Sequence, residues 1–143
     1  MPADNTDSGP LIDCAGFPIV RVNAPAATLS EAAAAALLSD LDAVLQRGAR
    51  YAVVAQGGPP DLPEKARGDF ARWFKRERQT LAALCAGMVF IMPDPQARAS
   101  LTAQLEAAAQ HGLYPYPVTT ADAEKPALSW AEASLRRGGP PPS

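Results

Sequence analysis

The stretch from Leu62 to Met92 constrains the fold of this chain more than any other part of the sequence. Large apolar residues recur in it at helical spacing and predict one long amphipathic helix from Leu62 to Ala86. The apolar face of this helix is formed by Phe70, Trp73, Phe74, Leu81, Leu84 and Cys85. An apolar run follows directly, from Gly87 to Met92, as is typical of a strand buried on both faces.

Strands and helices are expected to alternate on both sides of this stretch. The expected strands are 11–14, 17–22, 51–55, 88–92 and an edge strand at 113–118. The other expected helices are 28–47, 96–110 and 127–136. Such alternation predicts an α/β fold with a single four- to five-stranded, mostly parallel sheet and flanking helices.

Local residues set the expected ends of these elements. Thr28 is expected to cap the first helix together with Glu31, because a hydroxyl and a carboxylate three residues apart form a capping box. Gly48 is expected to end the same helix, since glycine readily adopts the left-handed conformation found there. Prolines in the segment 113–118 cannot donate to a neighbouring strand and therefore indicate a sheet edge.

The length of the chain, 143 residues, suits one domain with a real core and is too short for two typical ones. Residues 1–10 are polar and predict a disordered leader, and 137–143, rich in glycine and proline, predict a disordered tail. The single α/β domain is thus expected to span residues 11–136.

Charge, hydropathy and cysteine usage exclude several classes of function. A formal net charge of −2 argues against a general nucleic-acid binder. No apolar run approaches the ~20 residues that span a bilayer, and the acidic N-terminus is unlike a signal peptide. Cys14 and Cys85 lie in apolar surroundings and are expected to be reduced, buried thiols. We therefore expect a soluble, cytoplasmic protein without membrane insertion.

The ends of the predicted strands offer one candidate site. Parallel sheets usually bind ligands beyond the C-terminal ends of their strands, and these ends carry Gln56, Gly57, Gly58 and Asp94, with Arg98 close behind. The glycine pair allows backbone amides to approach an anion, although no phosphate-binding motif is present. The alternative is a plain connecting loop.

The central helix also carries the most visible charge feature of the chain. Its basic residues are Lys65, Arg67, Arg72, Lys75, Arg76 and Arg78. With three acidic neighbours the segment has a net charge of +3, whereas the rest of the chain has −5. One interpretation is a surface that docks a partner through Arg72, Lys75 and Arg76. The other is a solvated helix face with local ion pairs.

No catalytic or metal-binding signature appears in the sequence. His111, the single histidine, stands at a helix C-terminus beside Gly112, where the helix dipole favours a positive charge, so a capping role is expected. One histidine and two separated cysteines do not make a metal site, and no cofactor is expected. Catalytic groups that meet only in the fold remain an open alternative.

The segment Tyr114-Pro115-Tyr116-Pro117 is aromatic and rigid. It fits a recognition surface or a sheet edge that is open to pairing. It equally fits a packed edge strand whose phenolic hydroxyls lie at the boundary with water.

Together these segments resemble the SpoIIAA-like (STAS or CRAL-TRIO-like) family of small bacterial proteins, and within it a subgroup of undefined function. The resemblance lies in Arg78-Gln-Thr-Leu-Ala-Ala-Leu-Cys-Ala-Gly-Met-Val-Phe-Ile91, in Arg98-Ala-Ser-Leu-Thr102 and in the Tyr-Pro-Tyr-Pro-Val edge followed by Ala-Leu-Ser-Trp130-Ala. It covers residues 11–136. It implies a small sheet flanked by helices in a regulatory protein that binds a partner, and some members bind nucleotides or lipids.

The resemblance has one clear departure from the family pattern. Signalling members carry a phosphorylatable Ser or Thr at the start of the helix that follows a central strand. The matching loop here, Gly57 to Pro63, contains neither residue. A switch that adds negative charge at this helix start is therefore not expected.

These observations lead to three hypotheses about function. The first is a non-catalytic regulatory or scaffolding module that binds a protein partner through the basic helix and the strand-end loops. The second is a carrier of a small hydrophobic or anionic ligand, with an apolar pocket of roughly 300 Å³ or more between the central helix and the sheet. The third is a small enzyme that acts by positioning. Alanine-rich helix faces leave a homodimer open.

Overall fold

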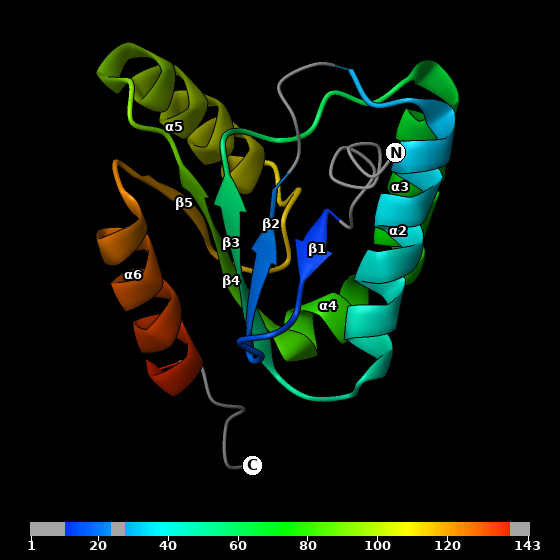
Figure 1. Ribbon diagram of the computed structural model, residues 1–143, viewed down its shortest axis with the longest axis horizontal. Coiled ribbons are helices and arrows are strands. Elements are labelled where there is room, and N and C mark those ends of the chain that lie inside the picture. The colour runs from blue at the N-terminus through cyan, green and yellow to red at the C-terminus, as the bar shows by residue number, and fades with distance from the viewer. Residues whose placement is uncertain (1–10, 24–27, 138–143) are drawn as a thin grey trace, which may run out of the picture.

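The computed structural model describes residues 11–23 and 28–137. The predicted leader at 1–10 lies outside the described residues, as does all of the predicted tail but residue 137. The described chain forms one five-stranded sheet with five flanking helices (Figure 1). The predicted α/β fold with a mostly parallel sheet is thereby confirmed.

The strands occur in the sheet in the same order as in the chain. They are β1 (Ile12–Asp13), β2 (Ile19–Val22), β3 (Tyr51–Gln56), β4 (Cys85–Ile91) and β5 (Val118–Ala121). β1 is antiparallel to β2, and the other three pairs are parallel. Each crossover therefore leads to the adjacent strand, so β2 to β5 contain no reversal of strand order.

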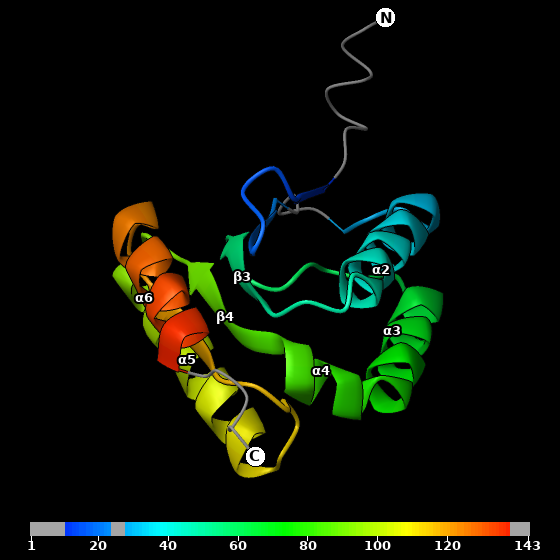
Figure 2. The same ribbon diagram turned by 90° about the horizontal axis from the view of Figure 1, so that it is seen from below.

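The helices cover both faces of the sheet. They are α2 (Glu31–Gln46), α3 (Glu64–Arg76), α4 (Arg78–Leu84), α5 (Pro95–Gln110) and α6 (Glu124–Arg137). Figure 2 shows α6 on one side of the sheet and α2, α3 and α4 on the other. Leu101 and Leu105 of α5 belong to the same apolar cluster as the side chains of α2 and α3.

Small residues bring α6 close to its face of the sheet. Ala127 and Ala131 of α6 pack on a cluster that includes Ala52 of β3 and Val89 of β4. Three of these four residues are alanines, and all four have no accessible surface. Because small side chains let a helix approach a sheet closely, α6 packs directly on β3 and β4.

The predicted long helix from Leu62 to Ala86 is wrong: it is two helices, α3 and α4, and the strand begins at Cys85 rather than Gly87. The break lies at Glu77, whose backbone has φ −97° and ψ 14°. α3 packs on α2, whereas α4 packs on β4. One straight helix cannot satisfy both contacts, and the chain therefore turns at Glu77.

Three other boundaries differ from the prediction. The cap of α2 is Ser30, whose Oγ accepts a hydrogen bond of 3.0 Å from the Ala33 N–H, whereas the Thr28 hydroxyl donates to Asp61. The last strand is Val118–Ala121 rather than 113–118, because the residues before it include prolines that cannot donate to a ladder. α6 begins at Glu124, three residues earlier than expected.

Two predicted helix ends are confirmed. Gly48 follows α2 with φ +72°, and Gly112 follows α5 with φ +70°. Both values lie in the left-handed region that glycine adopts without steric cost. His111 is the C-cap of α5, as expected from its position beside Gly112.

Candidate functional site

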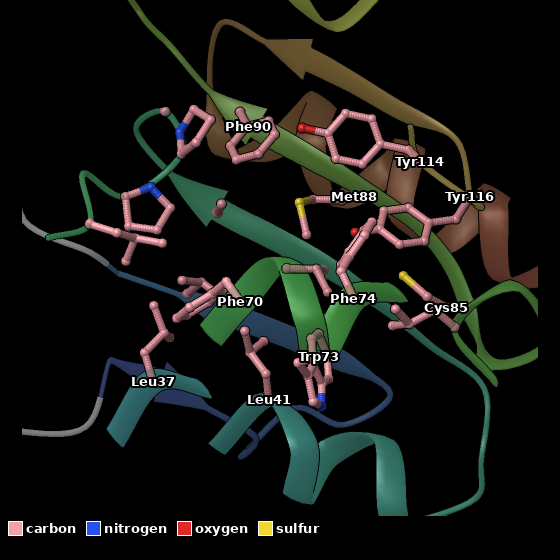
Figure 3. Close-up of a pocket in the computed structure, with 18 of the residues that line it drawn as sticks. Leu37, Leu41, Phe70, Trp73, Phe74, Cys85, Met88, Phe90, Tyr114 and Tyr116 are labelled. Atoms are coloured by element: carbon pink, nitrogen blue, oxygen red, sulfur yellow. The ribbon is translucent and has the colours of Figure 1, made fainter. Parts of the chain in front are cut away.

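A cavity of about 250 Å³ lies between the sheet and the helices α2, α3 and α4 (Figure 3). Its walls are mostly aliphatic and aromatic. The residues that line it are Val22, Leu37, Leu41, Tyr51, Val53, Ala55, Gln56, Gly58, Pro59, Pro60, Leu62, Phe70, Trp73, Phe74, Leu81, Cys85, Met88, Phe90, Tyr114 and Tyr116. This is the place where the carrier hypothesis expected a pocket.

The sheet floor of the cavity follows from strand alternation. On β3, Tyr51, Val53 and Ala55 face the cavity, while the residues between them face α6. On β4, Met88 and Phe90 follow the same rule.

Cys85 breaks the alternation because of an irregularity in the pairing of β3 with β4. Tyr51 pairs with Cys85, but the next residue, Ala52, pairs with Gly87, so Ala86 is an extra residue. A bulge of this kind shifts the phase of all residues on one side of it. Cys85 therefore lines the cavity, whereas Ala86 packs in the cluster under α6.

The helical wall of the cavity is held by a hydrogen bond between two helices. The Trp73 indole Nε1 of α3 donates to Asp42 Oδ1 of α2 at 2.9 Å. The ring of Trp73 is 4 % exposed and forms part of the wall together with Leu41. Because α3 leans on α2 in this way, the space between α3 and the sheet stays open.

Three aromatic rings close one side of the cavity. The Tyr114 and Tyr116 ring centroids are 5.9 Å apart. The Phe74 ring lies edge-on to both of them, with centroid distances of 6.1 Å. Such edge-to-face contacts orient aromatic rings, so the tyrosines of the β4–β5 connection are fixed against α3.

The polar groups of the cavity stay uncharged at neutral pH. Burial is the main cause that raises the pKa of Tyr51, of Tyr114 and of Tyr116. Burial also raises the pKa of the Cys85 thiol from its ordinary value of 9.0 to about 12. A thiol is a nucleophile only as its thiolate, so Cys85 is unreactive in this environment.

The mouth of the cavity is formed by the loop after β3. Gln56 is exposed, and Gly58, Pro59 and Pro60 continue the rim. Gly57 has φ +84°, and its N–H donates to the Ile91 carbonyl at 3.0 Å. This bond ties the loop to the end of β4. Of the predicted glycine pair, only Gly58 therefore reaches the cavity.

The predicted docking residues lie on the outer face of α3 and do not line the cavity. Arg72 forms an ion pair with Asp69, and Arg76 Nε lies 3.1 Å from Glu77 Oε2. The hydrogen bond from Arg72 is the main cause that lowers the pKa of Asp69. Among the described residues, Lys75 has no ionic partner. Two of the three cations are thus paired locally.

The remaining predicted residues perform structural tasks. Asp94 is the N-cap of α5, and its Oδ2 accepts a hydrogen bond of 2.8 Å from the Ala97 N–H. Arg98 donates to the carbonyl oxygens of Met92 at 2.9 Å and Pro93 at 3.3 Å. Both side chains stabilise the turn from β4 into α5.

The described residues contain no group of three or more His, Cys, Asp and Glu side chains that is able to hold a metal ion. His111 is exposed, and Cys14 and Cys85 are both free thiols. No helix within 11–23 and 28–137 combines the length and the apolar character that crossing a membrane requires.

The fold and the cavity define an α/β domain with an internal apolar pocket. No known family model, no curated protein and no solved structure matches the chain.

Sequence reasoning missed the polar residues of the cavity. The sequence places Tyr51 and Cys85 only in a buried strand and at the end of an apolar helix face, and their proximity depends on the pairing of β3 with β4. For Tyr114 and Tyr116, the repeated Tyr-Pro pattern is the one indication, and it fits a recognition surface as well as a packed edge. Their place against Phe74 depends on a contact between distant segments.

Proposed function

We propose that this protein is a non-catalytic domain that binds a small, mainly apolar molecule in the cavity between its sheet and α2, α3 and α4. The observation that carries the proposal is the cavity itself, about 250 Å³ in volume with aliphatic and aromatic walls. Ligand pockets are typically concave, largely apolar and equipped with a few polar groups. The cavity has each of these properties.

The volume sets the size of the ligand. Ligand pockets usually start near 300 Å³, so the present cavity is slightly smaller than that range. An apolar cavity of about 150 Å³ already binds benzene. The ligand is therefore somewhat larger than a single six-membered ring.

The docking hypothesis is kept as the second candidate. It is favoured by the exposure of Arg72, Lys75 and Arg76 on one helix. Ion pairs on the protein surface contribute little to stability, so a partner with acidic side chains can displace them. Docking on the outer face of α3 gives no role to the cavity beneath this helix, however, and the cavity therefore favours the first proposal.

The family resemblance supports the binding proposal in a limited way. A small sheet with flanking helices is the architecture that the SpoIIAA-like resemblance implies, and some members of that family bind lipids. We propose a regulatory role for ligand binding in the cytoplasm, where the free thiols Cys14 and Cys85 stay reduced.

The test uses ligand-detected NMR to measure binding of a neutral apolar probe, cumene, to the full chain. We expect saturable binding to the wild type and none to Ala55→Leu, because Ala55 faces the cavity and a larger side chain fills it. Ala109→Leu on the exposed face of α5 is the matched control and leaves binding unchanged. If Ala55→Leu does not fold, Leu41→Phe is the alternative variant, because it fills the cavity from the side of α2.

Native mass spectrometry of the chain purified from its own host provides an independent measurement. A bound small compound that is lost from Ala55→Leu supports the proposal. Wild-type protein that neither carries a compound nor binds cumene, in a sample with intact circular dichroism, refutes it.

A further inference from the structure

The volume of the cavity limits the size of a ligand, and the side chains that line the cavity indicate which chemical class of ligand it accepts. Among the described residues that line the cavity, none carries a formal charge. Burying an ion without a partner is very costly. A carboxylate or an ammonium group inside this cavity would have no counter-ion, and this disfavours charged ligands.

The polar groups of the cavity are not spread evenly. Tyr51 and Cys85 are the first residues of β3 and β4, while Gln56 and Phe90 lie near the opposite ends of these strands. The two other tyrosines belong to the β4–β5 connection. Leu37, Leu41 and Phe70 form the apolar side of the cavity, opposite Tyr114 and Tyr116 (Figure 3).

Two of the phenolic hydroxyls are free to meet a ligand. The Cys85 thiol lies close enough to Tyr51 to add to the rise of the Tyr51 pKa that burial causes, and that thiol donates to the Gly87 carbonyl at 3.7 Å. Within the described part of the chain, the Tyr114 and Tyr116 hydroxyls have no protein hydrogen-bond partner, yet both residues line the cavity. Figure 3 shows the Tyr114 hydroxyl directed into the cavity toward Phe90.

A phenol that stays protonated acts as a hydrogen-bond donor. A phenol with the ordinary pKa of 10.0 is already protonated at neutral pH, and burial raises the pKa of Tyr114 and of Tyr116 further. Because both residues line the cavity, a ligand that supplies an acceptor there gains a hydrogen bond from a phenol. The cavity therefore favours ligands that place a hydrogen-bond acceptor near the hydroxyl of Tyr114 or Tyr116.

We propose that the cavity selects uncharged molecules that carry a hydrogen-bond acceptor of the carbonyl type, with the acceptor at Tyr114 and Tyr116. The apolar part of the molecule lies on the side of Phe70 and Leu37, across the cavity from the two tyrosines. The inference rests on the proposed binding function and specifies its ligand class: small ketones, aldehydes or esters with an aromatic or aliphatic body. Their carboxylate counterparts are excluded.

Three probes with the same number of heavy atoms test this selectivity: acetophenone, cumene and benzoate. We expect acetophenone to bind about threefold to tenfold more tightly than cumene, the range that one or two net hydrogen bonds provide. Benzoate is expected to bind more weakly than either. Dissociation constants are measured at neutral pH by NMR titration of the full chain.

Tyrosine-to-phenylalanine variants assign the effect to particular hydroxyls. The double variant Tyr114→Phe/Tyr116→Phe is expected to bring the ratio of the affinities for acetophenone and cumene down to about one. Ala109→Leu on the exposed face of α5 is the matched control and is expected to preserve this ratio. If the double variant is unstable, each single variant is expected to lower the ratio partway.

The outcomes separate this inference from the proposed function. Three results would overturn the inference: equal affinities for acetophenone and cumene, an affinity ratio that is unchanged in the double variant, or benzoate binding as tight as acetophenone binding. In each of these cases, binding of cumene would still support the apolar-ligand function. Failure of all three probes to bind folded protein overturns both.

Discussion

Among the described glycines, Gly87 has the least room for a side chain. A Cβ atom added there would lie 2.6 Å from Cη2 of Trp130 and 3.0 Å from its Cζ3. The indole ring is rigid and lies between α6 and β4, so it cannot move away easily. We expect Gly87→Ala to lower the free energy of unfolding by about 1–3 kcal/mol, the usual cost of overpacking, as measured by urea denaturation.

Gly16→Ala is the matched control for this prediction. An added Cβ there meets only the Ile19 carbonyl oxygen at 3.8 Å, which is an ordinary contact. A second variant, Gly87→Ala/Trp130→Leu, removes the ring and is expected to recover part of the loss. Wild-type stability in Gly87→Ala alone would show that α6 is free to shift outward.

At the scale of the element, the end of α3 at Glu77 sets the position of the helical wall of the cavity. α3 and α4 are separated by one residue, Glu77; α3 packs on α2, whereas α4 packs on β4 as well as on α2. α3 leans on α2 through the Trp73–Asp42 hydrogen bond, which leaves room above the sheet. Were the two helices one, the wall and the floor of the cavity would close on each other.

The role of Asp94 as the N-cap of α5 can be tested by mutation. We expect Asp94→Ala to lower the free energy of unfolding by about 1 kcal/mol, because the Ala97 N–H loses its cap. Asp94→Asn keeps a capping oxygen and is expected to retain nearly all of the stability. Both are measured by thermal and urea unfolding. Equal losses in the two variants would mean that the charge of Asp94, rather than its capping oxygen, matters.

Much of the element order was predictable from local pattern, and much of the site was not. The burial of Trp73 and the alternation of strands with helices follow from periodicity within one segment. The break at Glu77 does not, because the apolar spacing continues across it and only packing on α2 and β4 requires it. The inward position of Cys85 depends on the bulge at Ala86, which appears only when β3 and β4 are paired.

At the scale of the whole molecule, the buried acidic groups predict a loss of stability at high pH. Burial raises the pKa of Tyr51 and of Tyr116 above the ordinary 10.0, and that of Cys85 from 9.0 to about 12. The unfolded chain releases these protons near the ordinary values, whereas the folded chain retains them. Rising pH therefore favours the unfolded state.

We expect stability to be nearly constant with respect to these groups below about pH 9 and to fall as the pH rises toward 12. Phenolate absorbance and loss of helical circular dichroism are expected to appear in one transition. Tyr116→Phe removes one of the groups and is expected to move the transition to higher pH. Titration of all three tyrosines near pH 10 in protein that stays folded would contradict the prediction.

In the part of the chain that the structure describes, α6 alone covers the sheet face that carries Ala52 and Val89, and it follows every strand. A polypeptide that has left the ribosome as far as β5 contains the complete sheet but still exposes this apolar face to water. Exposed apolar surface of this kind makes partly synthesised chains aggregate. The delay before α6 emerges is thus the period in which this protein most needs a chaperone.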